Sequence, residues 1–343
     1  MRRAWSLALA LAALAASSMG AGCSADSFVG ADAGTDHAVV FDDVWREFDL
    51  HYSFFELKHV NWDSLGAHYR PYAIAATTDE QFATVLGKML AELNDVHVSI
   101  TPTGVTNNTI RVMAHSDTIP TYFSPGLVFD KYVGASRFTS GRHLRYGMAT
   151  PTIGYVYIAD FSGRDWDAEM DEALEGLGSA RSLVIDVRNN AGGTYDLAAA
   201  VAGRFADRSR VFGYIRRRNG PGHADFTDYT PETVSPVGTR HFPGPVTVLA
   251  NRRSFSTAEN FVLAMKAQPS VTIVGDTTAG ASGAPIVREL PNGWTYQLSE
   301  WIEYTPARKI FEGVGIAPNI VVRPTARDAQ QGIDSVLERA LKP

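Results

Sequence analysis

The chain has 343 residues, of which 45% are hydrophobic and 20% are charged, and its formal net charge is −6. This composition is ordinary for a globular protein, and the acidic balance offers no basic field that would favour a nucleic-acid partner. The length suffices for one large domain and a smaller one, and the single cysteine excludes an internal disulfide and a cysteine-based metal site.

The N-terminal residues have the pattern of an export signal. A pair of arginines precedes an apolar run from Trp5 to Ala16, which is too short to span a bilayer. Cys23 follows in a segment that resembles the cleavage site of bacterial lipoproteins, although Gly20 stands where a leucine is usual. We therefore expect residues 1–23 to be the signal peptide of an exported protein. Lipidation of Cys23, which would give a membrane-anchored periplasmic or outer-membrane lipoprotein, and ordinary cleavage after a small residue are evenly weighted alternatives.

Helical periodicity dominates the next part of the chain. Residues 24–37 are small and polar and predict a flexible tether. Three segments then repeat apolar residues with the period of a helix. They run from Phe41 to Tyr52, from Trp62 to Tyr69 and from Thr78 to Leu93. The second is expected to end before Pro71, since proline removes a helical hydrogen bond, and Thr78 with Gln81 caps the third. Together they predict a small N-terminal helical domain over residues 38–101.

Strands and helices alternate in the second half of the chain. Residues 102–150 are rich in loop-forming residues, and the sequence predicts no element there. Buried strands are expected at residues 154–159, 183–187, 246–250 and 271–274. Helices are expected over residues 166–174, over residues 195–205 and after Ser256. This alternation predicts an α/β core with a mainly parallel sheet, and the pattern from Ile286 to Tyr304 predicts antiparallel strands.

A serine lies where the strand at 246–250 gives way to the next helix. Backbone N–H groups at such a turn have no helical partner, so they could hold an oxyanion formed by attack of Ser256. The alternative is structural, because Ser256 and Glu259 are spaced as a capping box, and such boxes are far commoner than active sites. Residues 186–193 offer a candidate oxyanion hole, because paired glycines after a strand let backbone N–H groups approach a ligand. A plain strand-to-helix turn is the alternative there.

Several of these segments carry the motifs of one family, in the family's order. D-V-R-N-N-A-G-G at 186–193 resembles the D-[LV]-R-x-N-x-G-G signature of the S41 serine peptidases, the carboxy-terminal processing and tricorn-type proteases. S-F-S-T-A-E at 254–259 resembles their S-x-S-x-x-E segment, whose second serine is the nucleophile. V-G-D-T-T-A-G at 274–280 is similar to their V-G-x-x-T-x-G segment, and residues 41–100 are similar to their N-terminal helical region. The resemblance implies that residues 102–343 form a crotonase/ClpP-like α/β catalytic domain.

The chain departs from the carboxy-terminal processing branch at its catalytic base. That branch has a lysine in a G-K-G segment, where this chain has Gly280-Ala281-Ser282, and neither Lys266 nor Lys309 is at a matching position. The tricorn and interphotoreceptor-retinoid-binding-protein-like branch uses a histidine and a glutamate instead. His97 and Glu312 match these two residues. The resemblance therefore implies a histidine base, which can take up and return a proton near neutral pH, oriented by a carboxylate.

The neighbours of the histidine leave its connection to the acid open. The tricorn protease has a serine directly before its histidine, and this serine links the histidine to the glutamate. Here that residue is Val96, so the link is expected through water or through Ser99. Asp95 is the alternative orienting acid.

The resemblance implies a serine endopeptidase that cleaves peptides or unfolded proteins through an acyl-enzyme. No metal or cofactor is expected, because the sequence has no H-E-x-x-H motif and its nine histidines are scattered. The oxyanion hole would consist of the N–H groups of Thr257 and of Gly192 or Gly193. The segment 102–150 is too short for the PDZ domain that many processing proteases insert, so none is expected. Two other hypotheses stay open: a non-catalytic ligand- or peptide-binding protein on the same fold, and a Ser/Lys dyad that uses one of the two lysines named above.

Overall fold

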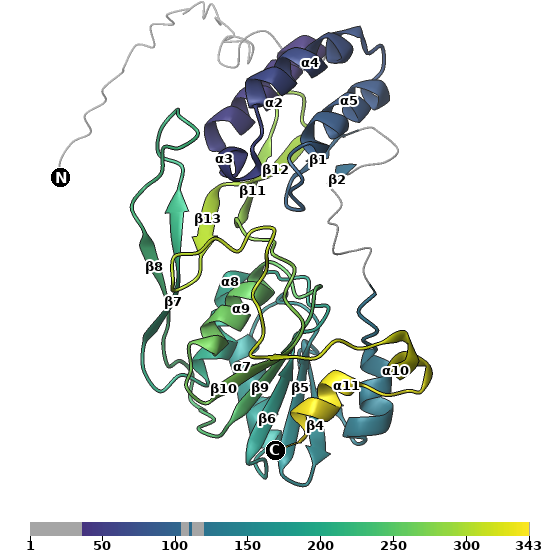
Figure 1. Ribbon diagram of the computed structural model, residues 1–343, viewed down its shortest axis with the longest axis vertical. Helices are drawn as coiled ribbons and strands as arrows, with labels where there is room; N and C mark the ends of the chain where they lie inside the picture. The colour runs from purple at the N-terminus through teal and green to yellow at the C-terminus, as the bar shows by residue number, and fades with distance from the viewer. Residues whose placement is uncertain (1–35, 104–109, 112–119, 343) are drawn as a thin grey trace, which may run out of the picture.

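The structure, a computed structural model, describes residues 36–103, 110–111 and 120–342. The predicted signal peptide with Cys23 and nearly all of the predicted tether at 24–37 lie outside the described residues. Two parts lie one above the other along the long axis, with the N-terminal helices at the top and a large sheet at the bottom (Figure 1). A small three-stranded sheet lies between them.

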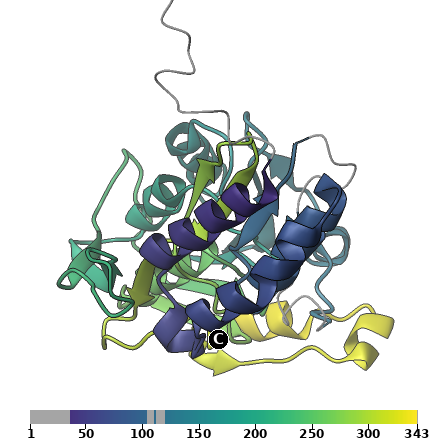
Figure 2. The ribbon, with the colours of Figure 1, turned by 90° about the horizontal axis from the view of Figure 1, so that it is seen from above.

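The N-terminal part is built from amphipathic helices that bury one face. Its helices are α2 (His37–His51), α3 (Phe55–Lys58), α4 (Trp62–Ala75) and α5 (Asp79–Ala91). The three expected helices are present, and the Thr78 side chain caps α5 by accepting a hydrogen bond from the Gln81 amide. Seen from above, the purple and blue helices lie side by side over the rest of the molecule (Figure 2).

The expected end of the second helix is wrong. Helix α4 continues through Pro71 to Ala75 instead of stopping before the proline. Proline deprives the carbonyl of Ala67 of its helical donor, but both residues are exposed, so water can satisfy that carbonyl. Beyond the proline, Ala73 is buried in the core, and this packing favours another helical turn.

The helices pack on a four-stranded antiparallel sheet with the order β11-β12-β1-β2. Its strands are β1 (Ser99–Thr101), β2 (Ile110–Arg111), β11 (Pro285–Glu289) and β12 (Thr295–Ser299). One hydrophobic core joins Phe48 and Leu86 of the helices to Tyr296 and Leu298 of β12. The predicted domain boundary at residue 101 therefore does not coincide with a boundary in the packing, since strands from near the C-terminus complete the core of the helical part.

The large sheet has seven strands in the order β14-β10-β9-β6-β5-β4-β3. They are β3 (Arg137–Phe138), β4 (Leu144–Thr150), β5 (Ile153–Ile158), β6 (Ser182–Asp186), β9 (Val246–Ala250), β10 (Val271–Gly275) and β14 (Ile320–Val321). The strands from β14 to β5 are parallel, and β4 and β3 are antiparallel to their neighbours. The predicted mainly parallel sheet is thus confirmed. Strand β4 lies where the sequence predicts no element, because its buried residues do not alternate regularly with more accessible ones.

Helices cover both faces of the large sheet, as the alternation of side chains along each strand requires. Ile185 of β6 points into a core with α7 (Trp166–Gly176), α8 (Tyr195–Gly203) and α9 (Thr257–Lys266). Its neighbour Val184 points into the opposite core with the π-helix η2 (Val128–Val133) and α11 (Ser335–Ala340). The short helices α6 (Pro125–Leu127) and α10 (Ala326–Gln330) connect these elements.

The three-stranded sheet is antiparallel, with the order β13-β7-β8. Its strands are β7 (Arg210–Arg217), β8 (Thr230–Val234) and β13 (Trp301–Tyr304). Only β13 belongs to a segment for which the sequence predicts a strand. Within the described ranges, no helix combines the length and the apolar character needed to cross a bilayer.

Candidate active site

Ser256 lies at the turn between β9 and α9, in a backbone conformation that ordinary residues seldom adopt. Its φ is 56° and its ψ is −126°. The turn is held from outside: the Ser254 hydroxyl donates to the Val187 carbonyl at 2.7 Å, and the Phe255 amide donates to the Asn190 carbonyl at 3.0 Å. These bonds tie the turn to the loop that follows β6, so the sheet fixes the position of Ser256.

The predicted capping box at the start of α9 is present, and its glutamate does more than cap the helix. The Ser256 amide donates to Glu259 Oε2 at 3.2 Å. The same buried carboxylate accepts hydrogen bonds from the Thr278 hydroxyl at 2.6 Å and from the amides of Gly280 and Ala281, both at 2.8 Å. Burial raises the pKa of Glu259 to about 7, although these hydrogen bonds oppose the rise. Glu259 therefore joins the serine turn to the loop after β10.

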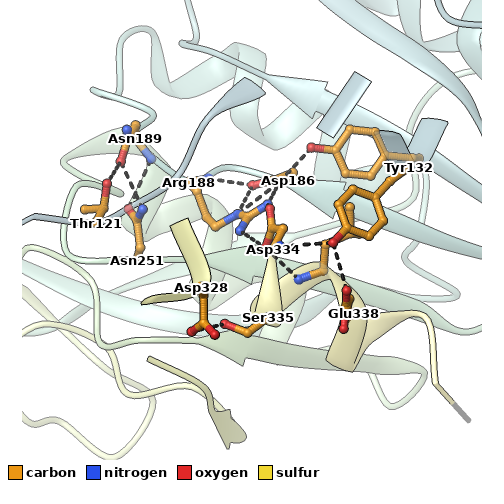
Figure 3. A network of polar contacts seen from close by, with 12 residues as sticks. Thr121, Tyr132, Asp186, Arg188, Asn189, Asn251, Asp328, Asp334, Ser335 and Glu338 are labelled. Carbon is orange, nitrogen blue, oxygen red and sulfur yellow. Dashed lines mark hydrogen bonds and ion pairs between the residues drawn. The ribbon is translucent and has the colours of Figure 1, made fainter. Parts of the chain in front are cut away.

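The loop after β6 is anchored by a buried network of charges (Figure 3). The Arg188 guanidinium donates two hydrogen bonds of 2.8 Å to Asp334, which precedes α11, and donates to both carboxylate oxygens of Asp186. The Tyr155 hydroxyl donates to the same Asp186 carboxylate at 2.7 Å. Two carboxylates around one planar cation give a satisfied buried cluster, which holds the start of the D-V-R-N-N-A-G-G segment to the sheet.

The end of that segment presents backbone groups to the serine. The Gly192 amide donates to the Asn190 side chain at 2.8 Å, so this N–H is already engaged. A Cβ at Gly192, where φ is 82°, would lie 2.8 Å from the Ser256 Cβ and 2.9 Å from the Thr257 nitrogen, so only glycine allows this approach. The amides of Gly193 and Thr257 donate to no other described residue, and both residues line the same cavity.

The imidazole of His97 is held in one tautomer. Its Nδ1 lies 3.0 Å from the Ser282 carbonyl oxygen, which can only accept, so Nδ1 carries the proton. In the neutral ring, Nε2 is then the unprotonated nitrogen. This atom is buried and has no hydrogen-bond partner among the described residues. Burial lowers the pKa of His97 below its usual value, which favours the neutral form that a general base requires.

Ser282 also contacts the predicted acid and thereby connects it to the histidine. Its amide donates to Glu312 Oε2 at 2.8 Å, and its hydroxyl donates to the same oxygen at 3.2 Å. The other oxygen of Glu312 accepts from Lys58 Nζ of α3 at 2.8 Å. Burial and the neighbouring Asp95 raise the pKa of Glu312 to about 7, and Lys58 opposes the rise. Ser282 thus contacts both residues, whereas the sequence suggested a link through water or through Ser99.

Sequence reasoning did not assign roles to Ser282 and Lys58. Ser282 stands in the segment where the lysine of the processing proteases is missing, and it acts largely through its backbone. Nothing in its residue type marked it as the link. Lys58 lies 254 positions before Glu312, and no local pattern relates the two residues.

The alternative residues are used elsewhere. The Asp95 carboxylate accepts from the backbone amide of His97 at 2.9 Å and from the Ser299 hydroxyl at 2.9 Å, so its bonds shape the turn that carries the histidine. Lys266 Nζ donates to the Ala317 carbonyl at 2.7 Å. Neither Lys266 nor Lys309 lines the cavity that contains the serine.

A cavity of about 720 Å³ brings the candidate residues together. His97, Ser256, Thr257, Gly193 and Ser282 line it. The His97 ring packs on the ring of Phe255, next to the serine, with centroids 5.1 Å apart. Glu312 does not line the cavity and lies behind Ser282. Among the residues that the structure describes, no three histidine, cysteine or acidic side chains gather in a way that could hold a metal ion.

Comparison with known proteins relates this chain to a peptidase family. A sequence model described as peptidase family S41 matches residues 152–322, and one described as the tricorn protease C1 domain matches residues 34–91. The carboxy-terminal-processing protease of Bartonella bacilliformis is 25% identical over 194 residues, which are 54% of this chain and 42% of that protein. The chain spans less than half the length of the curated relatives with the strongest matches.

Solved structures extend the likeness to nearly the whole chain. A candidate peptidase of Parabacteroides merdae is 30% identical, with a TM-score of 0.80 over 90% of this chain and 96% of that one. Mature CPAF, solved in complex with lactacystin, has 13% identity and a TM-score of 0.68 over 89% of this chain and 97% of that one, which shows a common fold. The crotonase/ClpP-like α/β class expected from the sequence agrees with these structures. The sequence predicts no element in residues 102–150, but residues from 120 onward form β3 and β4 of the large sheet and η2, which packs on one of its faces. The chain belongs to peptidase family S41.

Proposed function

We propose that the chain is an exported serine endopeptidase in which Ser256 is the nucleophile and His97 is the general base. The state of His97 carries the proposal. Its Nδ1–H is committed to the Ser282 carbonyl, its Nε2 has no partner among the described residues, and its ring lines the cavity that Ser256 also lines. A pure binding protein would have no need of the serine, the histidine and the glutamate together.

In the first step, the Ser256 oxygen bonds to the carbonyl carbon of a peptide while its proton passes to His97 Nε2. This transfer needs a hydrogen bond between the two side chains, which the described structure does not contain. We expect the bond to form when substrate fills the cavity, since catalytic hydrogen bonds often tighten only in the substrate complex.

The negative charge that develops on the carbonyl oxygen requires donors that are already in place. The amides of Gly193 and Thr257 are proposed for this role, because both line the cavity and neither donates to another described residue. Gly192, the other glycine considered, has its amide engaged by Asn190. Backbone donors that are fixed by the sheet and by α9 need no reorganisation during the reaction.

The remaining steps return the enzyme to its starting state. The protonated His97 gives its proton to the leaving amine, the C–N bond breaks, and an ester to Ser256 remains. Water then attacks the ester, again with His97 as base, and releases the acid. Glu312 acts as a positioning residue, because it holds the Ser282 amide and hydroxyl and so aims the Ser282 carbonyl at His97 Nδ1.

Cleavage of unstructured peptides by the protein without residues 1–23, combined with labelling by a fluorophosphonate, tests the proposal. We expect cleavage and labelling of the parent protein, loss of both in Ser256→Ala, and loss of cleavage in His97→Ala. Lys266→Ala and Lys309→Ala serve as controls and are expected to keep full activity, whereas a Ser/Lys dyad would require one of them. A folded protein that binds peptides but neither cleaves them nor takes up the label would instead be a binding protein on this fold.

Export is a separate part of the proposal and rests on the apolar run before Cys23. Mass spectrometry of the N-terminus of the protein isolated from its own cells tests it. A mature chain that begins at a lipid-modified Cys23 would establish the membrane anchor, and an unmodified start after a small residue would establish release into the exported compartment. An intact N-terminus would refute export.

A further inference from the structure

The wall of the cavity formed by the three-stranded sheet carries two acidic side chains. Glu303 of β13 pairs with Ile215 of β7, and Glu232 of β8 pairs with Gly213 of β7. Since alternate residues of a strand share a face, the two glutamates lie on the same face of the sheet, and both line the cavity. Gly213 keeps this face open: a Cβ there would lie 3.3 Å from Glu232 Oε2.

Neither carboxylate forms an ion pair with a described residue, and Glu303 is the more deeply buried of the two. Glu303 is only 4% exposed, and its Oε1 accepts from two neutral donors, Trp301 Nε1 at 3.1 Å and Asn260 Nδ2 at 3.3 Å. Glu232 is partly buried, and the Tyr195 hydroxyl favours its ionised form. Burial and the charge of Glu303 raise the pKa of Glu232 to about 8, and burial raises the pKa of Glu303 as well. With a pKa of about 8, Glu232 holds a proton near neutral pH, and a cation bound beside the two glutamates would displace that proton and favour their ionised forms.

The one arginine or lysine among the described residues that line the cavity is directed elsewhere. The Arg217 guanidinium lies over the Trp301 ring, 4.0 Å from its centroid, and pairs loosely with Glu300 at 3.9 Å. Its side chain is 48% exposed and lies at the rim, and its charge lowers the pKa of Glu232, against the larger effects of burial and of Glu303. The positions next to the two carboxylates are therefore open to a cation from outside.

The separation between Ser256 and the two glutamates suits the length of a substrate side chain. Asn260, which donates to Glu303, follows Ser256 by four residues, about one helical turn of 5.4 Å along α9. A lysine carries its ammonium on a four-carbon stem, so a residue held at Ser256 by its carbonyl could reach past Asn260 to the acids. Ile215 and Trp301 also line the cavity and offer apolar surface for the stem.

We propose that Glu232 and Glu303 form a specificity site that selects a lysine or arginine side chain directly before the bond that Ser256 cleaves. The inference rests on the proposed function and adds the substrate class to it. An ammonium or guanidinium group would donate hydrogen bonds to both carboxylates and favour their ionised forms. An uncharged side chain of equal length offers neither interaction.

The test compares peptides that are identical except for lysine, arginine or norleucine before the scissile bond. We expect kcat/KM for the lysine and arginine peptides to exceed that for norleucine by about 10- to 100-fold, the usual value of a charge-assisted contact. Glu303→Gln and Glu232→Gln should each reduce this ratio toward one. Glu289→Gln removes a carboxylate from the exposed strand β11 and should leave activity and ratio unchanged. No preference in the parent protein, or a preference that survives both substitutions, would overturn the proposal.

Binding to the Ser256→Ala protein separates this inference from the proposed function. Calorimetry should show tighter binding of the lysine peptide than of the norleucine peptide, and Glu303→Gln or Glu232→Gln in that background should abolish the difference. Selective binding without cleavage by the parent protein would support the acidic site and refute the peptidase. Cleavage that ignores charge would support the peptidase and refute the site. Acetylated peptides complete the test, because selection of a free N-terminus instead of the side chain would overturn the assignment.

Discussion

The substitution Glu312→Gln tests how the acid acts on His97. In the structure, one oxygen of Glu312 accepts both hydrogen bonds from Ser282, and the other accepts from Lys58. Glutamine keeps the shape of the side chain but has only one accepting oxygen. Turned one way, its NH₂ group faces the ammonium of Lys58, and turned the other way, it faces the amide of Ser282. The first orientation loses the hydrogen bond from Lys58, and the second loses the two hydrogen bonds that Ser282 donates.

The size of the effect follows from that loss. A hydrogen bond to a charged group contributes about 1.5–3 kcal/mol. If about 2 kcal/mol of this acts in the transition state, in which His97 is positively charged, kcat falls about 30-fold, since each 1.36 kcal/mol changes a rate tenfold. KM should stay unchanged, because Glu312 does not line the cavity. Steady-state kinetics on one peptide substrate, with urea unfolding as a check on folding, measures both quantities.

Ser282→Ala is the matched control. It removes only the hydroxyl bond of 3.2 Å to Glu312 and keeps the two backbone contacts, the amide to Glu312 and the carbonyl to His97. We expect a decrease in kcat of about fivefold at most, the equivalent of a typical hydrogen bond of about 1 kcal/mol. Equal losses in the two variants would mean that the hydroxyl carries the link, and an unchanged kcat in Glu312→Gln would refute the positioning role.

Three further predictions address pH dependence, the buried network and the serine turn. The acidic limb of kcat against pH should lie near pH 7, because the ionised Glu312 accepts from Ser282 and the pKa of Glu312 is about 7. In Glu312→Gln the limb should move below pH 6.5, because burial holds the pKa of His97 below that value. A limb that does not move would contradict this. Arg188→Met should lower the free energy of unfolding by about 3–5 kcal/mol in urea titrations, because it leaves two buried carboxylates unpaired, and a loss below about 1 kcal/mol would count against the network. Gly192→Ala should reduce kcat by about tenfold or more, since its Cβ meets Ser256. Gly134→Ala is the control, because Gly134 has a φ of 59° but no atom lies within 4 Å of the added Cβ, and it should leave kcat unchanged. Similar losses of kcat in the two variants would mean that backbone strain alone causes the loss in Gly192→Ala.

The sequence was informative wherever a structural signal is contained within one segment. The apolar stripe after Thr78 and its cap predicted α5, and the apolar run at 246–250 predicted β9 residue for residue. Such patterns work because periodicity and capping depend on neighbours a few positions apart. Pro71 is an instructive failure, since the expected helix end followed from a local rule, and burial of Ala73 outweighed it.

The candidate site divides in the same way. The sequence by itself determined that a serine lies at a strand-to-helix turn, that glycines follow a neighbouring parallel strand, and that a histidine and a glutamate stand in the positions of one branch of the family. Tertiary structure alone decided how these residues are joined. The link between His97 and Glu312 uses backbone atoms of Ser282, and every residue has such atoms, so residue type could not reveal it. Lys58, Glu232 and Glu303 come from segments far apart in the chain, and only the packing of the helical part and the three-stranded sheet against the catalytic core brings their charges to the site.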